Sequence, residues 1–245
     1  GTLAWVIGMS AAAVTAPSSK PAGAWLPLRA YPRPASPDTG WGIHDNPNCG
    51  WIPDRPEAFF DELKRRWGFS WFKVLACGQN KLRVVAAARR AGVEPVVRLY
   101  ASTPHPHFPA TERGETEFVE DIRAYVKAGA RYFECGNEPN LSDEWAAGEW
   151  DKPERIERLC RQWLRARRLV SEAGGIPVFY ALAPGSSDGR SAPDWWEDCF
   201  ETFRRWGKID EAFAGAAFGA HLGTLNHPLE YPFDASRNLP HATAE

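Results

Sequence analysis

Short apolar runs alternate with longer amphipathic segments along this chain of 245 residues, and this alternation limits the fold more than any other feature. Runs with strand character are expected at 71–76, 95–100, 131–135, 177–182 and 216–221. Segments with helical spacing fall between them, at 55–67, 80–91, 115–128, 153–173 and 193–206. Near-continuous apolar strands in repeated β-α order favour a parallel sheet covered by helices.

Glycines mark the ends of three of these helices, because Gly92, Gly129 and Gly174 each follow a helical run directly and precede the next strand. Closing a barrel of eight such units would require two more after residue 221, or about sixty residues at about thirty per unit. Only 223–245 remain, with three prolines and no apolar run. The fold class we expect is therefore α/β, either an incomplete (β/α)8 TIM barrel or a smaller α/β architecture.

The fourth expected strand runs directly into a Gly-Asn-Glu-Pro-Asn turn at 136–140. The carboxyl ends of parallel strands are where α/β proteins house their chemistry. Glu138 is therefore our candidate for a catalytic acid, and the Asn137 amide could hold a substrate hydroxyl. Pro139 restricts the direction of the turn.

The run 133–141, with Trp145 shortly after it, resembles the fourth-strand signature of clan A glycoside hydrolases, closest to the β-xylosidase and α-iduronidase type family. The resemblance implies a TIM barrel, a retaining mechanism, and Glu138 as general acid/base with Asn137 on the sugar's 2-hydroxyl. It also suggests a first strand at 42–44 and a sixth strand ending in His221. Members carry the nucleophilic Glu at the end of strand seven, and this chain stops before such a strand.

Other residues at the expected strand ends are candidates for substrate binding: His44, Arg98, Tyr100 and His221 at the rim, with Trp145 and Trp150 as platforms for sugar rings. Arg98 and Tyr100 share strand parity, so both are expected on one face. A second carboxylate is harder to place, because Glu134 lies deeper on the same strand and Glu230 lies on a loop beyond strand six.

These observations predict a glycosidase acting on a poly- or oligosaccharide, inactive in this form if no nucleophile follows. The alternative is a non-catalytic carbohydrate-binding barrel, and a third possibility is an α/β domain without a ligand. No cofactor is implied, because no glycine-rich phosphate loop follows any strand. His105 and His107, together with His44 and Asp45, match no established zinc spacing, so no metal site is predicted.

Composition separates the broader classes. The formal charge of −2 and the solvated face of the Arg-rich helix at 153–173 argue against a nucleic-acid partner. Five scattered cysteines without a CxxC pair fit neither a disulfide framework nor a zinc knuckle, and we expect buried thiols.

Residues 1–39 form an apolar then Pro-rich segment, expected to be a signal remnant and a linker outside the packed fold, with the catalytic domain at 40–245. No other run is long enough to cross a membrane. Secretion and a cytoplasmic location both stay open, as does the oligomeric state.

Overall fold

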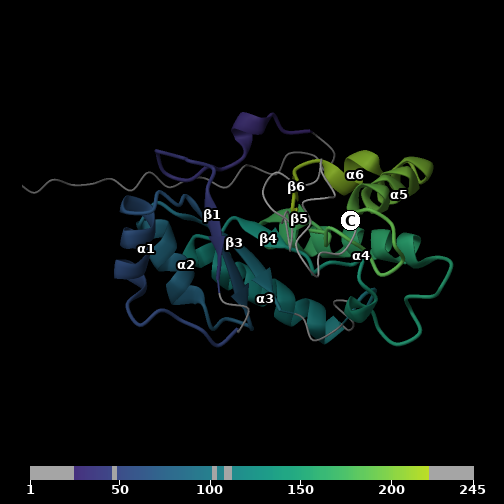
Figure 1. The fold of residues 1–245 in the computed structure, drawn as a ribbon, viewed down its shortest axis with the longest axis horizontal. Coiled ribbons are helices and arrows are strands. Elements are labelled where there is room, and N and C mark those ends of the chain that lie inside the picture. Colours follow the sequence, from purple (N-terminus) through teal and green to yellow (C-terminus); the bar gives the residue numbers. More distant parts are fainter. Residues whose placement is uncertain (1–24, 46–48, 101–103, 108–111, 221–245) are drawn as a thin grey trace, which may run out of the picture.

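The computed structural model describes residues 25–45, 49–100, 104–107 and 112–220, and in these residues the chain has an α/β fold of the TIM-barrel type (Figure 1). All paired strands are parallel and follow one another in the sheet in chain order. The strands are β1 (Gly42–His44), β2 (Trp71–Ala76), β3 (Glu94–Leu99), β4 (Tyr132–Glu134), β5 (Ile176–Phe179) and β6 (Ala217–Phe218). The predicted fold class is confirmed, and β1 and β6 are the two edges of a curled, incomplete barrel.

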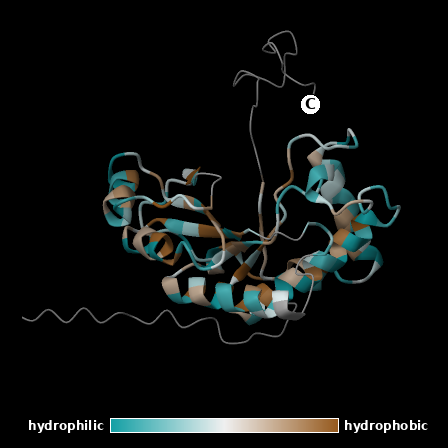
Figure 2. Cartoon of the chain, turned by 90° about the horizontal axis from the view of Figure 1, so that it is seen from below, coloured by the Kyte–Doolittle hydropathy of each residue, from teal (hydrophilic) through white to brown (hydrophobic). Residues whose placement is uncertain are grey.

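Helices cover the convex side of this sheet and lie in the connections between consecutive strands. They are α1 (Pro56–Arg65), α2 (Leu82–Arg90), α3 (Glu112–Ala128), α4 (Arg155–Glu172), α5 (Ala192–Arg205) and α6 (Ile209–Phe213), with short 3-10 turns η1 (Leu28–Ala30) and η2 (Ser142–Glu144). Figure 2 shows that the helices carry both hydrophobic and hydrophilic residues, as expected where one face packs on a sheet and the other meets water. None of the described helices has the length and apolar character that a membrane crossing needs.

The core lies between the strands and these helices. Phe72 and Val97 on the sheet pack with Phe60, Ile122 and other helix residues, all fully or almost fully buried. Helix α5 begins at a capping box, in which Ser191 and Asp194 exchange side-chain and backbone hydrogen bonds. The sequence pattern located the helices because their buried positions repeat with helical spacing.

Residues 25–39 pack against the barrel instead of standing apart from it as a linker. The Tyr31 hydroxyl donates to the Ala216 carbonyl at 2.9 Å, and the Tyr132 hydroxyl donates to the Pro32 carbonyl at 2.6 Å. The Ser70 hydroxyl donates to the Pro37 carbonyl at 3.1 Å. A proline-rich composition excludes regular strands and helices, but it does not exclude a fixed segment, and here that segment covers the amino ends of the strands.

One cysteine pair was not predicted. Cys49 and Cys77 form a disulfide with their Cα atoms 5.6 Å apart, joining the loops that follow β1 and β2. Cys135, Cys160 and Cys199 are buried free thiols, as expected. The pair was missed because its partners lie 28 residues apart and only the fold brings them together.

Candidate active site

A buried cation on β2 and a buried carboxylate on β4 face one another across β3, on the concave side of the sheet. The Lys73 ammonium on β2 lies 3.0 Å from one oxygen of Glu134 on β4 and 2.7 Å from the other. Their side chains are 17% and 3% exposed. A charge that points into a barrel is costly unless it is paired. Lys73 and Glu134 meet this condition by pairing with one another, although the strands around them are apolar.

Arg98 extends this cluster toward the turn after β4. It is in register with Glu134, and its guanidinium lies 4.0 Å from the nearer carboxylate oxygen. Arg98 also donates to the Asn137 side-chain oxygen, while the Asn137 amide nitrogen donates to Glu144 on η2. Polar contacts therefore run from the middle of the sheet to the loop after β4.

The electrostatics of the cluster depend on its burial. Burial lowers the pKa of the Lys73 ammonium, Glu134 opposes this effect, and the Arg98 charge adds to it. The carboxylate of Glu138 also raises the pKa of Lys73, which places Glu138 within electrostatic reach of the pair. His44 is exposed to solvent, and its pKa is nevertheless lowered, by partial desolvation first and then by the charges of Lys73 and Arg98, while the hydrogen bond to the Asp45 carbonyl raises it.

A cavity of about 1020 Å³ opens on the same side of the sheet. His44, Lys73 and Glu134 line its polar part. The rest of the wall is largely apolar and runs toward the amino ends of the strands, with contributions from Trp71, Val96, Tyr132, Val178 and Ala217. An apolar cavity with a few convergent polar groups is the usual form of a small-molecule site.

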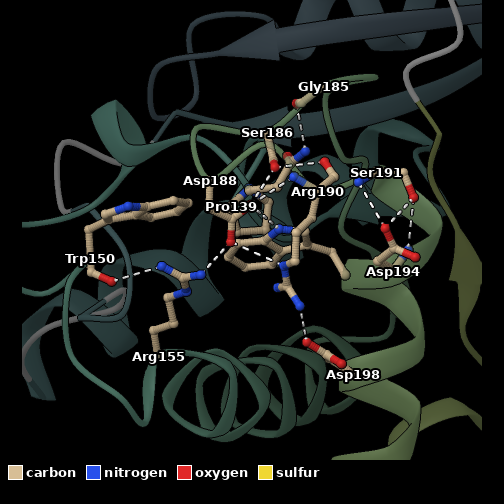
Figure 3. A network of polar contacts seen from close by, with 12 residues as sticks. Pro139, Trp150, Arg155, Gly185, Ser186, Asp188, Arg190, Ser191, Asp194 and Asp198 are labelled. Carbon is tan, nitrogen blue, oxygen red and sulfur yellow. Dashed lines mark hydrogen bonds and ion pairs between the residues drawn. The ribbon is translucent and has the colours of Figure 1, made fainter. Parts of the chain in front are cut away.

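The turn at 136–140 is fixed by contacts beneath it. Asn140 is fully buried, and its amide donates to the carbonyls of Ala183 and Gly185 at 2.8 and 2.9 Å. The loop that supplies these carbonyls is itself anchored, as Figure 3 shows, by Arg155 and Arg190 converging on Asp188. Burial acts to raise the pKa of the Asp188 carboxyl. Hydrogen bonds from Ser186, Trp195 and the Arg190 backbone outweigh this effect and lower the pKa to about 2.

The residues predicted for the site lie at different depths. His44, Arg98 and Asn137 belong to the polar cluster, and Glu138 is part-exposed and within electrostatic reach of Lys73. Tyr100 lies just past the end of β3 and is 60% exposed. His221 and Glu230 lie outside the described residues.

The two tryptophans predicted as sugar platforms are engaged with protein. Trp145 is buried, donates from its indole nitrogen to the Pro139 carbonyl at 2.7 Å, and packs near His105 and Trp150. The half-buried ring of Trp150 stacks on Trp195 at 5.5 Å between centroids and on the Arg155 guanidinium at 4.5 Å.

Sequence reasoning missed three residues of this region. Lys73 was detectable as the one charged residue inside the expected strand at 71–76. Glu144 lacks any such pattern, because η2 is too short to predict. The sequence offers His105 only for a metal hypothesis whose spacing fits no established site, and it gives no sign that the ring lies 2.8 Å from the Asn137 carbonyl.

Comparisons with known proteins identify similar folds and no family. No family model matches the chain, and no curated protein matches it. A D-psicose 3-epimerase from Clostridium cellulolyticum H10, solved with D-tagatose, is 12% identical over 64% of this chain and 59% of its own, with a TM-score of 0.42. A second D-psicose 3-epimerase structure, solved with D-fructose, is 10% identical over 77% and 74%, with a TM-score of 0.44.

A xylose isomerase domain protein from Alicyclobacillus acidocaldarius is 16% identical over 64% of this chain and 58% of its own, with a TM-score of 0.39. This chain spans less than two thirds of the length of that protein and of the first epimerase. At these identities the likeness concerns the fold alone.

The predicted glycoside hydrolase family is corrected by these comparisons. No family model supports it, and the matching barrels described above are epimerases and an isomerase domain protein. The assignments as glycosidase and as retaining enzyme are therefore wrong. The physical reason is that a ten-residue turn reports a local geometry, and a carboxylate after a strand is compatible with many reactions on one fold.

Proposed function

We propose that this chain carries an active site for proton transfer at a carbon atom next to a carbonyl group, in a small hydroxylated aldehyde or ketone. The observation that carries the proposal is the Lys73–Glu134 pair, a proton donor and a proton acceptor held 2.7 Å apart beside the cavity. Titratable groups with perturbed surroundings in a cleft are characteristic of catalytic sites.

Each member of the pair has a role in this chemistry. The Glu134 carboxylate removes the proton from the carbon, and the electron pair moves onto the carbonyl oxygen to give an enolate. The Lys73 ammonium and the Arg98 guanidinium stabilise that negative oxygen. For an isomerisation, Glu134 returns this proton to the former carbonyl carbon, while Lys73 gives a proton to the former carbonyl oxygen and takes one from the neighbouring hydroxyl, whose carbon becomes the new carbonyl. Glu134 is then again a carboxylate and Lys73 again an ammonium.

The remaining polar groups would bind the hydroxyls of the substrate. His44 and Asn137 offer ring and amide atoms beside the pair, and Glu138 at the mouth offers a carboxylate acceptor. We retain Tyr100 only as a contact for a larger substrate, because it is 60% exposed past the end of β3, whereas the Trp150 ring is occupied by Trp195 and Arg155.

Exchange of carbon-bound hydrogen with solvent tests the reaction class across many candidate substrates at once. The protein is incubated in D₂O with a panel of three- to six-carbon hydroxyaldehydes and hydroxyketones, and ¹H NMR follows loss of the signal next to the carbonyl. We expect exchange for at least one compound. Glu134→Gln and Lys73→Met should each lower its rate by about 10²–10⁴-fold, the usual contribution of a general acid or base.

Lys208 and Glu211 supply a matched control, because they form an exposed pair 3.0 Å apart on α6 and its amino end. Lys208→Met and Glu211→Gln remove the same charges and should leave exchange unchanged. The proposal fails if no compound exchanges above the protein-free rate, or if the Lys73 and Glu134 variants exchange as fast as the native protein.

A further inference from the structure

His105 is a buried imidazole beneath the turn that carries Asn137 and Glu138. The residue is 5% exposed. Its backbone N–H donates to the Glu144 carbonyl, and its carbonyl accepts from the Ala146 N–H, each at 2.8 Å. Its ring is edge-on to Tyr180, with centroids 5.5 Å apart. The ring therefore has a single fixed orientation.

Both ring nitrogens of His105 have close polar neighbours. Nε2 lies 2.8 Å from the Asn137 carbonyl oxygen, and Nδ1 lies 2.6 Å from the atom placed as Oε1 of Gln162 on α4. A neutral imidazole has one donor and one acceptor, so it cannot donate to two oxygens. Either the ring is a buried cation, or the Gln162 amide is turned the other way.

Burial argues against the cation. The pKa of His105 is lowered, chiefly by burial, even though Gln162, the Asn137 carbonyl and the Glu144 charge each act to raise it. The charged and titratable groups facing the ring are Glu144 and the buried phenol of Tyr180, whose own pKa is raised by burial. A neutral ring is therefore the better account of the site.

The Gln162 side chain gives a second reason to exchange the positions of its amide oxygen and nitrogen. Its side-chain nitrogen is buried and makes no hydrogen bond, although the residue is only 4% exposed. Turning the amide by half a rotation gives that nitrogen two partners, Nδ1 of His105 and the Tyr180 hydroxyl oxygen, which lies 3.3 Å from the same atom site. The Gln162 oxygen is then unpartnered and no longer accepts from the Tyr180 hydroxyl, but the amide nitrogen, a donor that otherwise makes no hydrogen bond, gains two acceptors.

The structure assigns His105 as a neutral imidazole protonated on Nε2, which donates to the Asn137 carbonyl and accepts from the Gln162 amide, and we propose that it is the positioning residue of the 136–140 turn. Glycine at 136 fits this role. A Cβ there would lie 3.0 Å from Cε1 of His105, and Gly136 has φ +123°. The ring thus packs directly under the turn backbone, and only glycine permits that approach.

This role rests on the proposed function, because Asn137 is the residue through which His105 would act on the substrate. The Asn137 backbone is held by His105 from below, while its side chain is held by Arg98 and Glu144. Loss of the Nε2 donor would let the turn shift relative to Lys73 and Glu134. A displacement of about 1 Å at a catalytic site is enough to lower a rate on the order of 10²-fold.

The protonation state is measured by ¹⁵N NMR on protein labelled at histidine, with His105 assigned by the signals lost in His105→Gln. We expect one protonated nitrogen, Nε2, and one unprotonated nitrogen, Nδ1, and we expect this pattern to persist below the ordinary histidine pKa of about 6.5. Two protonated nitrogens at neutral pH, or protonation on Nδ1 alone, would overturn the assignment. This readout does not depend on turnover, so it stands even if the solvent-exchange proposal fails.

Two conservative variants separate positioning from bulk packing. The amide of His105→Gln reaches the Nε2 position and can still donate to Asn137, whereas that of His105→Asn reaches only the Nδ1 position and keeps the Gln162 contact. We expect exchange to stay within about tenfold of native in His105→Gln and to fall on the order of 10²-fold in His105→Asn, with the loss in kcat. His107→Gln, an exposed neighbour paired with Glu149 at 3.7 Å, is the matched control.

A structural role alone predicts that the two amide variants lose activity equally and in proportion to their loss of stability. That outcome, measured by urea unfolding beside the exchange assay, would contradict the positioning role. Gln162→Met completes the set, because it removes the donor to Nδ1: the Nδ1 signal should move to the position of an unbonded nitrogen, while Nε2 stays protonated toward the Asn137 carbonyl and His107→Gln changes neither signal.

Discussion

Two buried glutamates at opposite ends of neighbouring strands are paired with two cations each, and yet they belong to different parts of the molecule. Glu94 begins β3, is fully buried, and is bound by Arg89 and Arg131, with the Arg131 Nε 3.0 Å from its carboxylate. Glu134 ends β4 and is bound by Lys73, with Arg98 at 4.0 Å. Charge and burial are nearly the same in the two clusters, but only Glu134 lines the cavity.

The difference shows that a buried ion pair acquires a functional interpretation from its place on the barrel. At the amino ends, which we call the closed end, residues 25–39 lie over the strands, and Arg131 also donates to the Arg33 carbonyl at 2.9 Å. Burial, and then repulsion from Arg89, lower the pKa of Arg131 to about 10. Charge pairing there serves stability, whereas toward the carboxyl ends, the open end, Lys73 and Glu134 line the cavity, which extends along the concave face of the sheet as far as Leu28 and Tyr31.

The largest expected effect on stability is at the closed end. Glu94→Gln leaves Arg89 and Arg131 without their carboxylate in a site that residues 25–39 cover, and we expect a loss of about 3–5 kcal/mol in the free energy of unfolding. Glu134→Gln, at the wall of the cavity, should cost less, about 1–3 kcal/mol. Urea unfolding of both variants checks this, and equal losses would break the comparison.

The disulfide at the rim of the open end should contribute next. Replacing Cys77 by Ser releases the link between the loops after β1 and β2, and a loop of 28 residues predicts a loss of about 2–4 kcal/mol. Unfolding under non-reducing conditions measures it, with Cys160→Ser, a buried free thiol, as the packing control. A native-like midpoint for Cys77→Ser would show that the link does not constrain the unfolded chain.

Acid should weaken the open end in particular. The pKa of His105 is lowered in the folded protein, so below about pH 6.5 the unfolded chain binds the proton that the folded protein excludes. Stability is therefore lost as pH falls through this window, by up to about 1.4 kcal/mol per pH unit from this residue. Unfolding measured between about pH 7 and 5 should show a shallower slope in His105→Gln. An unchanged slope would remove His105 as the cause.

The smallest effect is expected at exposed pairs, which are neither covered by a segment of chain nor beside the cavity. Lys208→Met, which removes the partner of Glu211, should change the free energy of unfolding by less than about 1 kcal/mol. Thermal unfolding at low and high salt checks it. A loss as large as that of Glu94→Gln would mean that burial does not separate these pairs.

The sequence predicted much of the architecture, because β2 to β5 lie in apolar runs such as 71–76 and each is followed by a periodic helix. It did not predict that residues 25–39 pack on the sheet, since their contacts with Ala216 and Tyr132 join positions 185 and 100 residues apart. The Cys49–Cys77 link was missed for the same reason, because no local pattern reports a contact between distant segments.

The candidate site was predictable only in part. A polar residue at a strand end marks the rim, and that rule found His44, Arg98 and Asn137. The Lys73–Glu134 pair depends on parity and register between residues 61 positions apart, which no local pattern gives. The family resemblance was misleading because only the turn at 133–141 was specific, and the residues around such a turn determine its chemistry.

The most direct test is the rate of solvent hydrogen exchange into hydroxyaldehydes and hydroxyketones, measured side by side for the native protein, Glu134→Gln and Glu94→Gln at a temperature where all three are folded. We predict exchange by the native protein and by Glu94→Gln, and a loss of about 10²-fold or more in Glu134→Gln. Equal rates for the two glutamine variants would contradict the assignment of the open end as the active site.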